Sequence, residues 1–165
     1  MASFNQSLLI ALISIYLSAT ATTTTTAIAI ATVSGSDIHD ILPQFGLPKG
    51  ILPDAVESYT LSPSDGAFTV QLTRPCYVQF DDQTVYYSKN IQGKLTYGSV
   101  SDVSGIQAKQ FFLWLSVTGM DLDTSSNMIE FHVGVLSKKL PAGMFLIVPD
   151  CKSKACQNEA QSQSI

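Results

Sequence analysis

The first amphipathic stretch of the chain is short and has the period of a helix. Its apolar side chains recur at positions i, i+3, i+4 and i+7, which places them on one helical face: Ile38, Ile41, Leu42 and Phe45. Ser36 or Asp37 can cap the start of this helix, and Gly46 followed by Pro48 supplies its end. Pro43 lies inside the pattern and lacks the N–H that a regular helical turn uses, so we predict a kink or break there.

From Tyr59 onward the period changes to two, which is the period of β-strands. Apolar and polar residues alternate in several short segments, whose apolar positions include Phe68, Val70 and Leu72, then Cys76, Val78 and Phe80, then Ile91 and Leu95, then Ile129, Phe131 and Val133. Residues 84–88 are predicted to form a separate strand before the one that contains Ile91. Short alternating strands joined by Gly, Asp and Ser turns are typical of an antiparallel sheet that curls or closes. We therefore predict a mostly β fold, a single antiparallel β-barrel-like domain (a curled sheet) with a short N-terminal helix.

One predicted strand, residues 111–117, is apolar on both faces. Phe112 and Trp114 point to the side opposite their neighbours, and a strand of this kind has to be covered on both faces. Two interpretations remain open: a central strand in a filled core, or a strand beside an incompletely filled barrel interior. In the second case an apolar ligand pocket forms, for which the candidate residues are Phe112, Trp114, Tyr97 and Phe131.

The N-terminal region has the features of a leader. No charged residue occurs before Asp37, and residues 8–17 form an apolar block of signal-peptide length that is too short to span a bilayer. Cleavage is expected after Ala21 or Ala31. A membrane anchor is the alternative, but it would have to include the threonines at 22–26.

These observations give the expected domain organisation. Residues 1–31 are a signal peptide with a Thr-rich spacer, residues 32–152 are the single β-barrel-like domain, and residues 153–165 are a flexible polar tail. We expect secretion, and no stable membrane span once the leader is removed.

Composition narrows the possible partners. The 165 residues carry 9 Lys+Arg and 13 Asp+Glu, for a formal net charge of −4, and charged residues make up only 13%. Low charge beside an ordinary 45% of hydrophobic residues argues against a disordered chain. Without a stripe of Lys and Arg, nucleic acid is not an expected partner.

The three cysteines are an odd number. In an oxidising compartment, a Cys76–Cys151 disulfide would join an early strand to the end of the domain and stabilise the fold by about 3–5 kcal/mol. Cys151–Cys156 would close only a tail, so we favour the first pairing, which leaves Cys156 without a partner.

Candidate chemistry is sparse. The only histidines are His39 and His132, there is no G-x-S-x-G motif, and no CxxC spacing is present. We therefore predict no catalytic residue, no metal site and no cofactor. The densest positive cluster consists of Lys138, Lys139, Lys152 and Lys154. It could attract an anionic head group or a carboxylate, or it could be a solvated face.

Several blocks of the sequence, taken in order, resemble a known family. They are residues 45–53 (FGLPKGILP), 74–80 (RPCYVQF), 93–98 (GKLTYG), 105–109 (GIQAK), 114–117 (WLSV) and 148–151 (VPDC). Together they resemble the plant "domain of unknown function 538" proteins over residues 38–151. The chain departs from the family pattern at Pro43 and after Cys151.

The resemblance carries expectations of its own. It implies a plant source, a barrel-like β domain with an N-terminal helix, and a likeness to lipid-binding proteins of the bactericidal/permeability-increasing type. Proposals for the family include amphiphile binding and chlorophyll hydrolysis, with links to stress responses and trichome growth. None of these identifies a catalytic residue in this chain.

Three functional hypotheses follow. The favoured one is a secreted, non-catalytic binder of a lipid or other amphiphile in an apolar barrel interior, located in the apoplast or cell wall. The first alternative is an extracellular protein-interaction module with a filled core. The second alternative is a weak esterase that acts on pigment or lipid esters.

Overall fold

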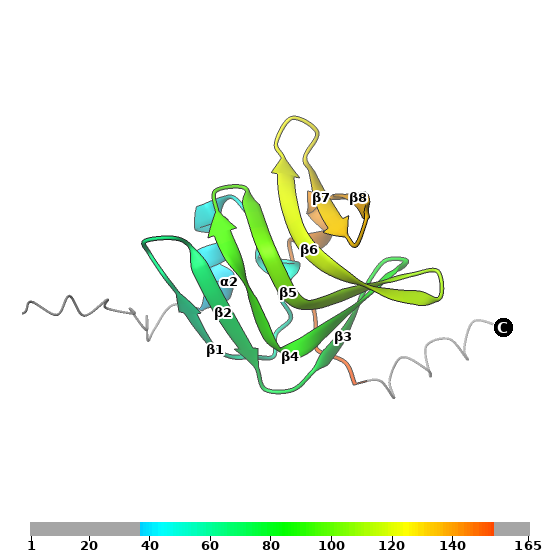
Figure 1. Ribbon diagram of the computed structural model, residues 1–165, viewed down its shortest axis with the longest axis horizontal. Helices are drawn as coiled ribbons and strands as arrows, with labels where there is room; N and C mark the ends of the chain where they lie inside the picture. The colour runs from blue at the N-terminus through cyan, green and yellow to red at the C-terminus, as the bar shows by residue number, and fades with distance from the viewer. Residues whose placement is uncertain (1–36, 154–165) are drawn as a thin grey trace, which may run out of the picture.

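In the computed structural model, residues 37–153 are described, and within them the chain forms one curled antiparallel sheet. The strands are β1 (Val56–Leu61), β2 (Ala67–Leu72), β3 (Cys76–Phe80), β4 (Gln83–Thr96), β5 (Ser99–Gln110), β6 (Leu113–Asp123), β7 (Met128–Val133) and β8 (Leu136–Pro141). Their order is β1-β2-β4-β5-β6-β7-β8, and β3 pairs with β4. The sheet curls strongly but stays open, with β1 and β8 at its two ends (Figure 1). The predicted curled, mostly β fold is confirmed, whereas a closed barrel is not formed.

Strand β4 is the centre of the architecture because it is long enough to pair with three strands. Its first half pairs with β3 and its second half with β2, while β5 runs along its other edge. The sequence predicted two separate strands here. The structure joins them through a bulge, where the close approach of Gly105 (φ +87°) to the carbonyl of Asn90 leaves no room for a side chain. This irregularity bends the strand and lets the sheet curl.

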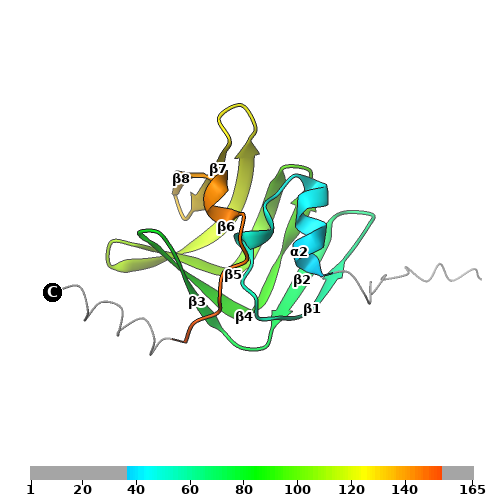
Figure 2. The ribbon, with the colours of Figure 1, turned by 180° about the vertical axis from the view of Figure 1, so that it is seen from behind.

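Short helical segments lie on one face of the curled sheet (Figure 2). They are α2 (Ile38–Ile41), η1 (Leu42–Phe45), η2 (Lys49–Ile51) and η3 (Ala142–Phe145). Asp37 caps α2 by accepting a hydrogen bond from the backbone N–H of His39, and Gly46 ends η1 with a left-handed φ of 75°. The predicted break at Pro43 is confirmed, because the helix changes to a 3₁₀ turn one residue before the proline.

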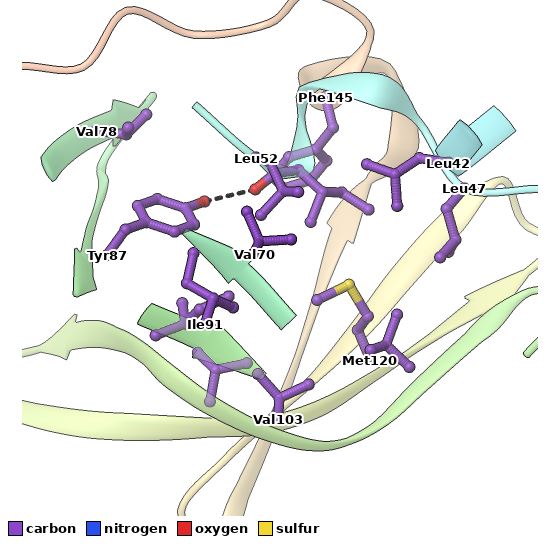
Figure 3. Packing of buried hydrophobic residues seen from close by; sticks show 14 of the residues in the cluster. Leu42, Leu47, Leu52, Val70, Val78, Tyr87, Ile91, Val103, Met120 and Phe145 are labelled. Atoms are coloured by element: carbon purple, nitrogen blue, oxygen red, sulfur yellow. Dashed lines mark hydrogen bonds between the residues drawn. The ribbon is translucent and has the colours of Figure 1, made fainter. Parts of the chain in front are cut away.

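The core lies between the helical segments and the concave face of the sheet (Figure 3). Tyr87 of β4 is buried there, and its hydroxyl donates a 2.7 Å hydrogen bond to the carbonyl of Ile51 in η2. Burial raises the pKa of Tyr87, so its phenol stays protonated and remains a donor. This bond fixes η2 to the centre of the sheet.

A disulfide between Cys76 and Cys151 joins β3 to the C-terminal segment. Beside it, Tyr77 and Lys152 exchange two backbone hydrogen bonds of 2.9 and 3.1 Å. The favoured cysteine pairing is therefore present. Cys156 and the expected leader lie outside the described residues. Within residues 37–153 no helix is both long and apolar enough to cross a membrane.

The segment predicted as a strand apolar on both faces has a different structure. Phe111 and Phe112 form the turn of the β5–β6 hairpin, where they are 90% and 95% exposed, and β6 begins only at Leu113. The pattern of apolar residues runs through the turn because the turn contains no Gly, Asn or Pro to mark it. The strand is therefore not covered on both faces at this end.

Candidate binding cavity

The described part of the chain forms an apolar cavity, partly open to solvent, on the concave side of the sheet. Every strand from β3 to β8 contributes to its lining, together with Ile51 of η2 and Phe145 of η3. Phe145 closes one side, with its ring centroid 4.8 Å from that of Phe80 and 5.3 Å from that of Phe131. The space open to the centre of a water-sized sphere is about 40 Å³. A single water needs roughly 10–15 Å³ by the same measure, so this space holds a small group and not a whole lipid.

A second apolar space of about 30 Å³ lies next to it, between the N-terminal helical segments and strands β2, β4 and β5. The two cavities share three lining side chains, Ile51, Ile106 and Met120. These side chains form the partition between the two spaces. Met120 is the only unbranched one of the three, so it is the side chain that can most easily change its rotamer.

Polar side chains of the first cavity gather around Gln83, which is only 4% exposed. Its Nε2 donates to the carbonyl of Lys109 at 2.7 Å, and its Oε1 accepts from Lys138 Nζ at 2.8 Å and from Gln110 Nε2 at 3.0 Å. Gln83 therefore holds Lys138 and Gln110 together at the edge of the cavity. All three residues are in the cavity lining.

Lys138 is the one charged residue in that lining. Its neighbour Lys139 faces the other way and lies 3.7 Å from Asp123 and 3.6 Å from Glu130. Among the ion pairs of residues 37–153, none includes Lys138. The ammonium group is therefore held by a neutral amide and has no carboxylate partner in the described part of the chain.

Of the four side chains proposed from sequence for a pocket, the structure places only Phe131 in the cavity. Trp114 lies on the outer face, with its ring centroid 5.9 Å from that of Tyr77 and 6.3 Å from that of Tyr86. Phe112 is in the hairpin turn, and Tyr97 is 78% exposed in the turn after β4. The structure thus does not bring the four together. Gln83 and Gln110 were missed because a glutamine at the end of a strand carries no distinctive sequence signal.

The two histidines have different surroundings. The buried His39 has Asp37 Oδ1 2.6 Å from Nδ1 and the carbonyl of Pro53 3.2 Å from Nε2. Both of its nitrogens face oxygen atoms, so it connects the start of α2 to the segment between η2 and β1. Burial works to raise the pKa of Asp37, but the hydrogen bonds from His39 outweigh it and hold that pKa below its usual range.

His132 lies in a Ser–His–Asp arrangement on the protein surface. Its Nε2 is 2.6 Å from Asp121 Oδ2, its Nδ1 is 3.3 Å from Ser137 Oγ, and Ser99 Oγ donates to Asp121 Oδ1 at 2.6 Å. Hydrogen bonds from His132 and Ser99 lower the pKa of Asp121. None of these four residues lines either cavity. Within residues 37–153 no group of three or more His, Cys, Asp or Glu side chains is placed to hold a metal ion.

Residues 38–146 match the family described as "Protein of unknown function, DUF538". The chain belongs to the DUF538 family. Every lining residue of both cavities falls within the matched range, so the cavities are part of the family domain.

Among curated proteins, the chain is similar to an Arabidopsis thaliana relative, "Uncharacterized protein At5g01610". The two are 30% identical over 97 residues, which is 58% of this chain and 55% of the relative. The chain thus spans about half the length of that relative. No solved structure matches the chain. The implied likeness to lipid-binding proteins of the bactericidal/permeability-increasing type stays a prediction.

Proposed function

We propose that this protein is a non-catalytic binder of a single-chain amphiphile with an acidic head group. The apolar chain would enter the cavity beneath Phe145, and the head group would contact Lys138 at its edge. The observation that carries the proposal is a cavity with an apolar lining in which the one charged group is an ammonium without a carboxylate partner among residues 37–153. An isolated cation beside an apolar surface is suited to an anionic amphiphile.

The size of the cavity narrows the class of ligand. A space of about 40 Å³ is too small for a two-chain lipid. An elongated chain can gain room by displacing Met120 and reaching the second cavity, which adds about 30 Å³. Each methylene buried in this way contributes about 0.8 kcal/mol. We therefore expect a fatty acid or a similar single-chain acid to bind more tightly than a phospholipid.

The test is a calorimetric titration of the protein with laurate, and with dodecyltrimethylammonium as a ligand of equal chain length and opposite charge. The proposal predicts that laurate binds and that the cation does not. Lys138→Met should weaken laurate binding at least tenfold. Lys139→Met is the matched control, because Lys139 pairs with Asp123 and Glu130 on the other face, and it should bind laurate as the wild type does.

Equal binding of the two ligands, or unchanged binding of laurate by Lys138→Met, would contradict the assignment of the head-group site. Melting curves of the free variants provide the control for folding. Because Lys138 is only partly buried and its partner Gln83 keeps three other hydrogen bonds, we expect Lys138→Met to fold.

Ester hydrolysis is the second candidate, and the contact between His132 and Ser137 is the observation that favours it. A hydrolase also needs a bound substrate and donors for the oxyanion, and this surface arrangement adjoins neither cavity. We therefore expect p-nitrophenyl ester hydrolysis by the wild type to equal that by Ser137→Ala. A loss of activity of 100-fold or more in this variant would support the enzyme instead.

We also propose that the protein acts outside the cell. The Cys76–Cys151 disulfide supports this, because such bonds persist in oxidising compartments. The apolar block at residues 8–17 supports it as well. N-terminal sequencing of the protein recovered from the extracellular fluid of a plant host should find a start at residue 22 or 32. Recovery of the chain only inside the cells would contradict this proposal.

A further inference from the structure

The β5–β6 hairpin turn has an unusual composition. Two-residue hairpin turns favour Gly, Asn and Asp, because one or both positions need a positive φ. Among the non-glycine residues described with positive φ, three are of this kind: Asp81, Asp102 and Asn127. The fourth is Phe111, with φ +54° and 90% of its side chain exposed. A bulky apolar residue in this conformation is strained and unburied, so neither the turn nor the core accounts for it.

The surroundings of Phe111 are also apolar. Phe112 is 95% exposed and Leu113 is 66% exposed. In the neighbouring β7–β8 hairpin, Val135 of the turn is 100% exposed and Leu136, the first residue of β8, is 54% exposed. The backbone N–H of Gly134 in that turn donates to the carbonyl of Ser116 in β6 at 2.9 Å, which holds the two hairpins together. We call these five exposed residues (Phe111, Phe112, Leu113, Val135 and Leu136) the apolar tip.

An aromatic cluster lies directly behind the apolar tip. It consists of Trp114, Tyr77 and Tyr86, with ring centroids 5.0 to 6.3 Å apart. Trp114 remains 39% exposed. Apolar residues lie at the end of the molecule, and Trp and Tyr follow next to them. This arrangement matches the pattern found at membrane surfaces. There the amphipathic rings of Trp and Tyr sit at the level of the lipid head groups.

We propose that the apolar tip inserts into the surface of a lipid bilayer and docks the protein there. This docking proposal rests on the proposed function, because docking serves the transfer of an amphiphile between a bilayer and the cavity. Gln110, at the edge of the cavity, directly precedes Phe111 in the chain. Docking by the tip therefore brings the cavity edge and Lys138 to the lipid surface, where a single-chain amphiphile can pass between bilayer and cavity. In Figure 1 the β5–β6 hairpin projects from the body of the sheet.

The charged residues near the tip indicate whether it would bind a neutral or an anionic lipid surface. Gln83 donates to the backbone carbonyl of Lys109 and accepts from the ammonium of Lys138, and the β3–β4 turn that precedes Gln83 carries Asp81 and Asp82. With Lys152, which is paired with Tyr77 of the aromatic cluster, three positive and two negative residues lie in this region. The charges nearly balance, so attraction to anionic lipid is not the main contribution. The expected surface is a neutral phosphatidylcholine bilayer, and burial of the apolar tip in it drives binding.

The experiment uses Trp114, the single tryptophan of the chain, as a probe. Phosphatidylcholine vesicles should shift its fluorescence to shorter wavelength, and brominated phosphatidylcholine should quench it. Phe111→Gly combined with Phe112→Ser supplies a turn sequence that suits the positive φ at the first position. This variant should keep its near-ultraviolet circular dichroism and bind vesicles at least tenfold more weakly.

The matched control is Tyr97→Ser. Tyr97 is also an exposed aromatic residue, but it follows the end of β4 that is distant from the tip, and its loss should leave vesicle binding unchanged. Any contribution from the N-terminal apolar block is common to all variants and cancels in the comparison.

Three outcomes overturn the docking proposal: no response of the wild type to vesicles, undiminished binding by the Phe111/Phe112 variant, or equal loss in the Tyr97 control. If vesicles fail to bind while laurate still binds, docking is wrong and the proposed function stands. If vesicles bind through the tip while laurate does not, docking is correct and the proposed cavity function is wrong.

Discussion

At the residue scale, Phe111 is the clearest case of a side chain that does not suit its backbone conformation, because a bulky apolar residue has a positive φ. We predict that Phe111→Gly stabilises the protein by up to about 1 kcal/mol, because glycine adopts a positive φ without the Cβ clash, although it gains more freedom on unfolding. The midpoint of urea denaturation measures this. A variant less stable than the wild type would show that Phe111 makes a packing contribution that its 90% exposure does not indicate.

Asp121 gives a prediction for pH dependence. Hydrogen bonds from His132 and Ser99 lower its pKa in the folded protein below the ordinary value of 3.8. A group with a depressed folded pKa contributes stability that is present above the unfolded value and is lost as the pH falls through the folded value. We therefore expect Asp121→Asn to reduce the loss of stability between pH 4 and lower values. Denaturation curves at several acidic pH values provide the test, and an unchanged slope would contradict it.

The sequence predicts some of these residues and not others, for physical reasons. Phe131 was proposed as a pocket residue from its regularly alternating strand, and the structure places it in the cavity lining. Phe112 and Trp114 were placed inside because an apolar run through a turn has the same appearance as a strand buried on both faces. Gln83 is found only from the fold, since its role depends on Lys138, which is 55 residues away in the chain.

At the scale of elements, the bond between β4 and η2 has the clearest expected effect. Tyr87→Phe removes the hydroxyl that donates to Ile51 and leaves the ring in place. We predict a loss of about 1 kcal/mol in the free energy of unfolding, measured by urea denaturation. Tyr86→Phe on the outer face is the control, and it should change stability by less. Equal effects at the two positions would contradict a special role for the Tyr87 bond.

Element boundaries follow local chemistry where that chemistry is strong. The break before Pro43 and the end at Gly46 were predictable, because proline removes a donor and glycine accepts a left-handed φ. The continuity of β4 was not predictable, because the bulge that joins its halves depends on Gly105 of the neighbouring strand.

At the scale of the whole molecule, the disulfide joins segments 75 residues apart. We predict that Cys76→Ser lowers the free energy of unfolding by about 3–5 kcal/mol, mainly because the unfolded chain gains conformational entropy without the cross-link. Denaturation curves with and without reductant measure this. The reductant should shift the wild-type curve and leave the Cys76→Ser curve in place. A wild type insensitive to reductant would contradict a stabilising bond.

The open curled sheet explains why a cavity exists at all. A sheet that curls without closing leaves its concave face to be covered by other segments, and here η2 and η3 cover it incompletely. The sequence indicated the curl but left both a filled and a hollow interior open, because the fit of η3 against β3 and β7 depends on packing between distant segments.

The central claim is that this cavity takes a single-chain acid, and native mass spectrometry with added laurate tests it most directly. The comparison is between the wild type and Ala108→Leu, which places a larger side chain in the cavity lining. We predict one laurate bound to the wild type and none bound to the folded Ala108→Leu variant. Equal occupancy of the two proteins, or a wild type that binds no laurate, would contradict the account.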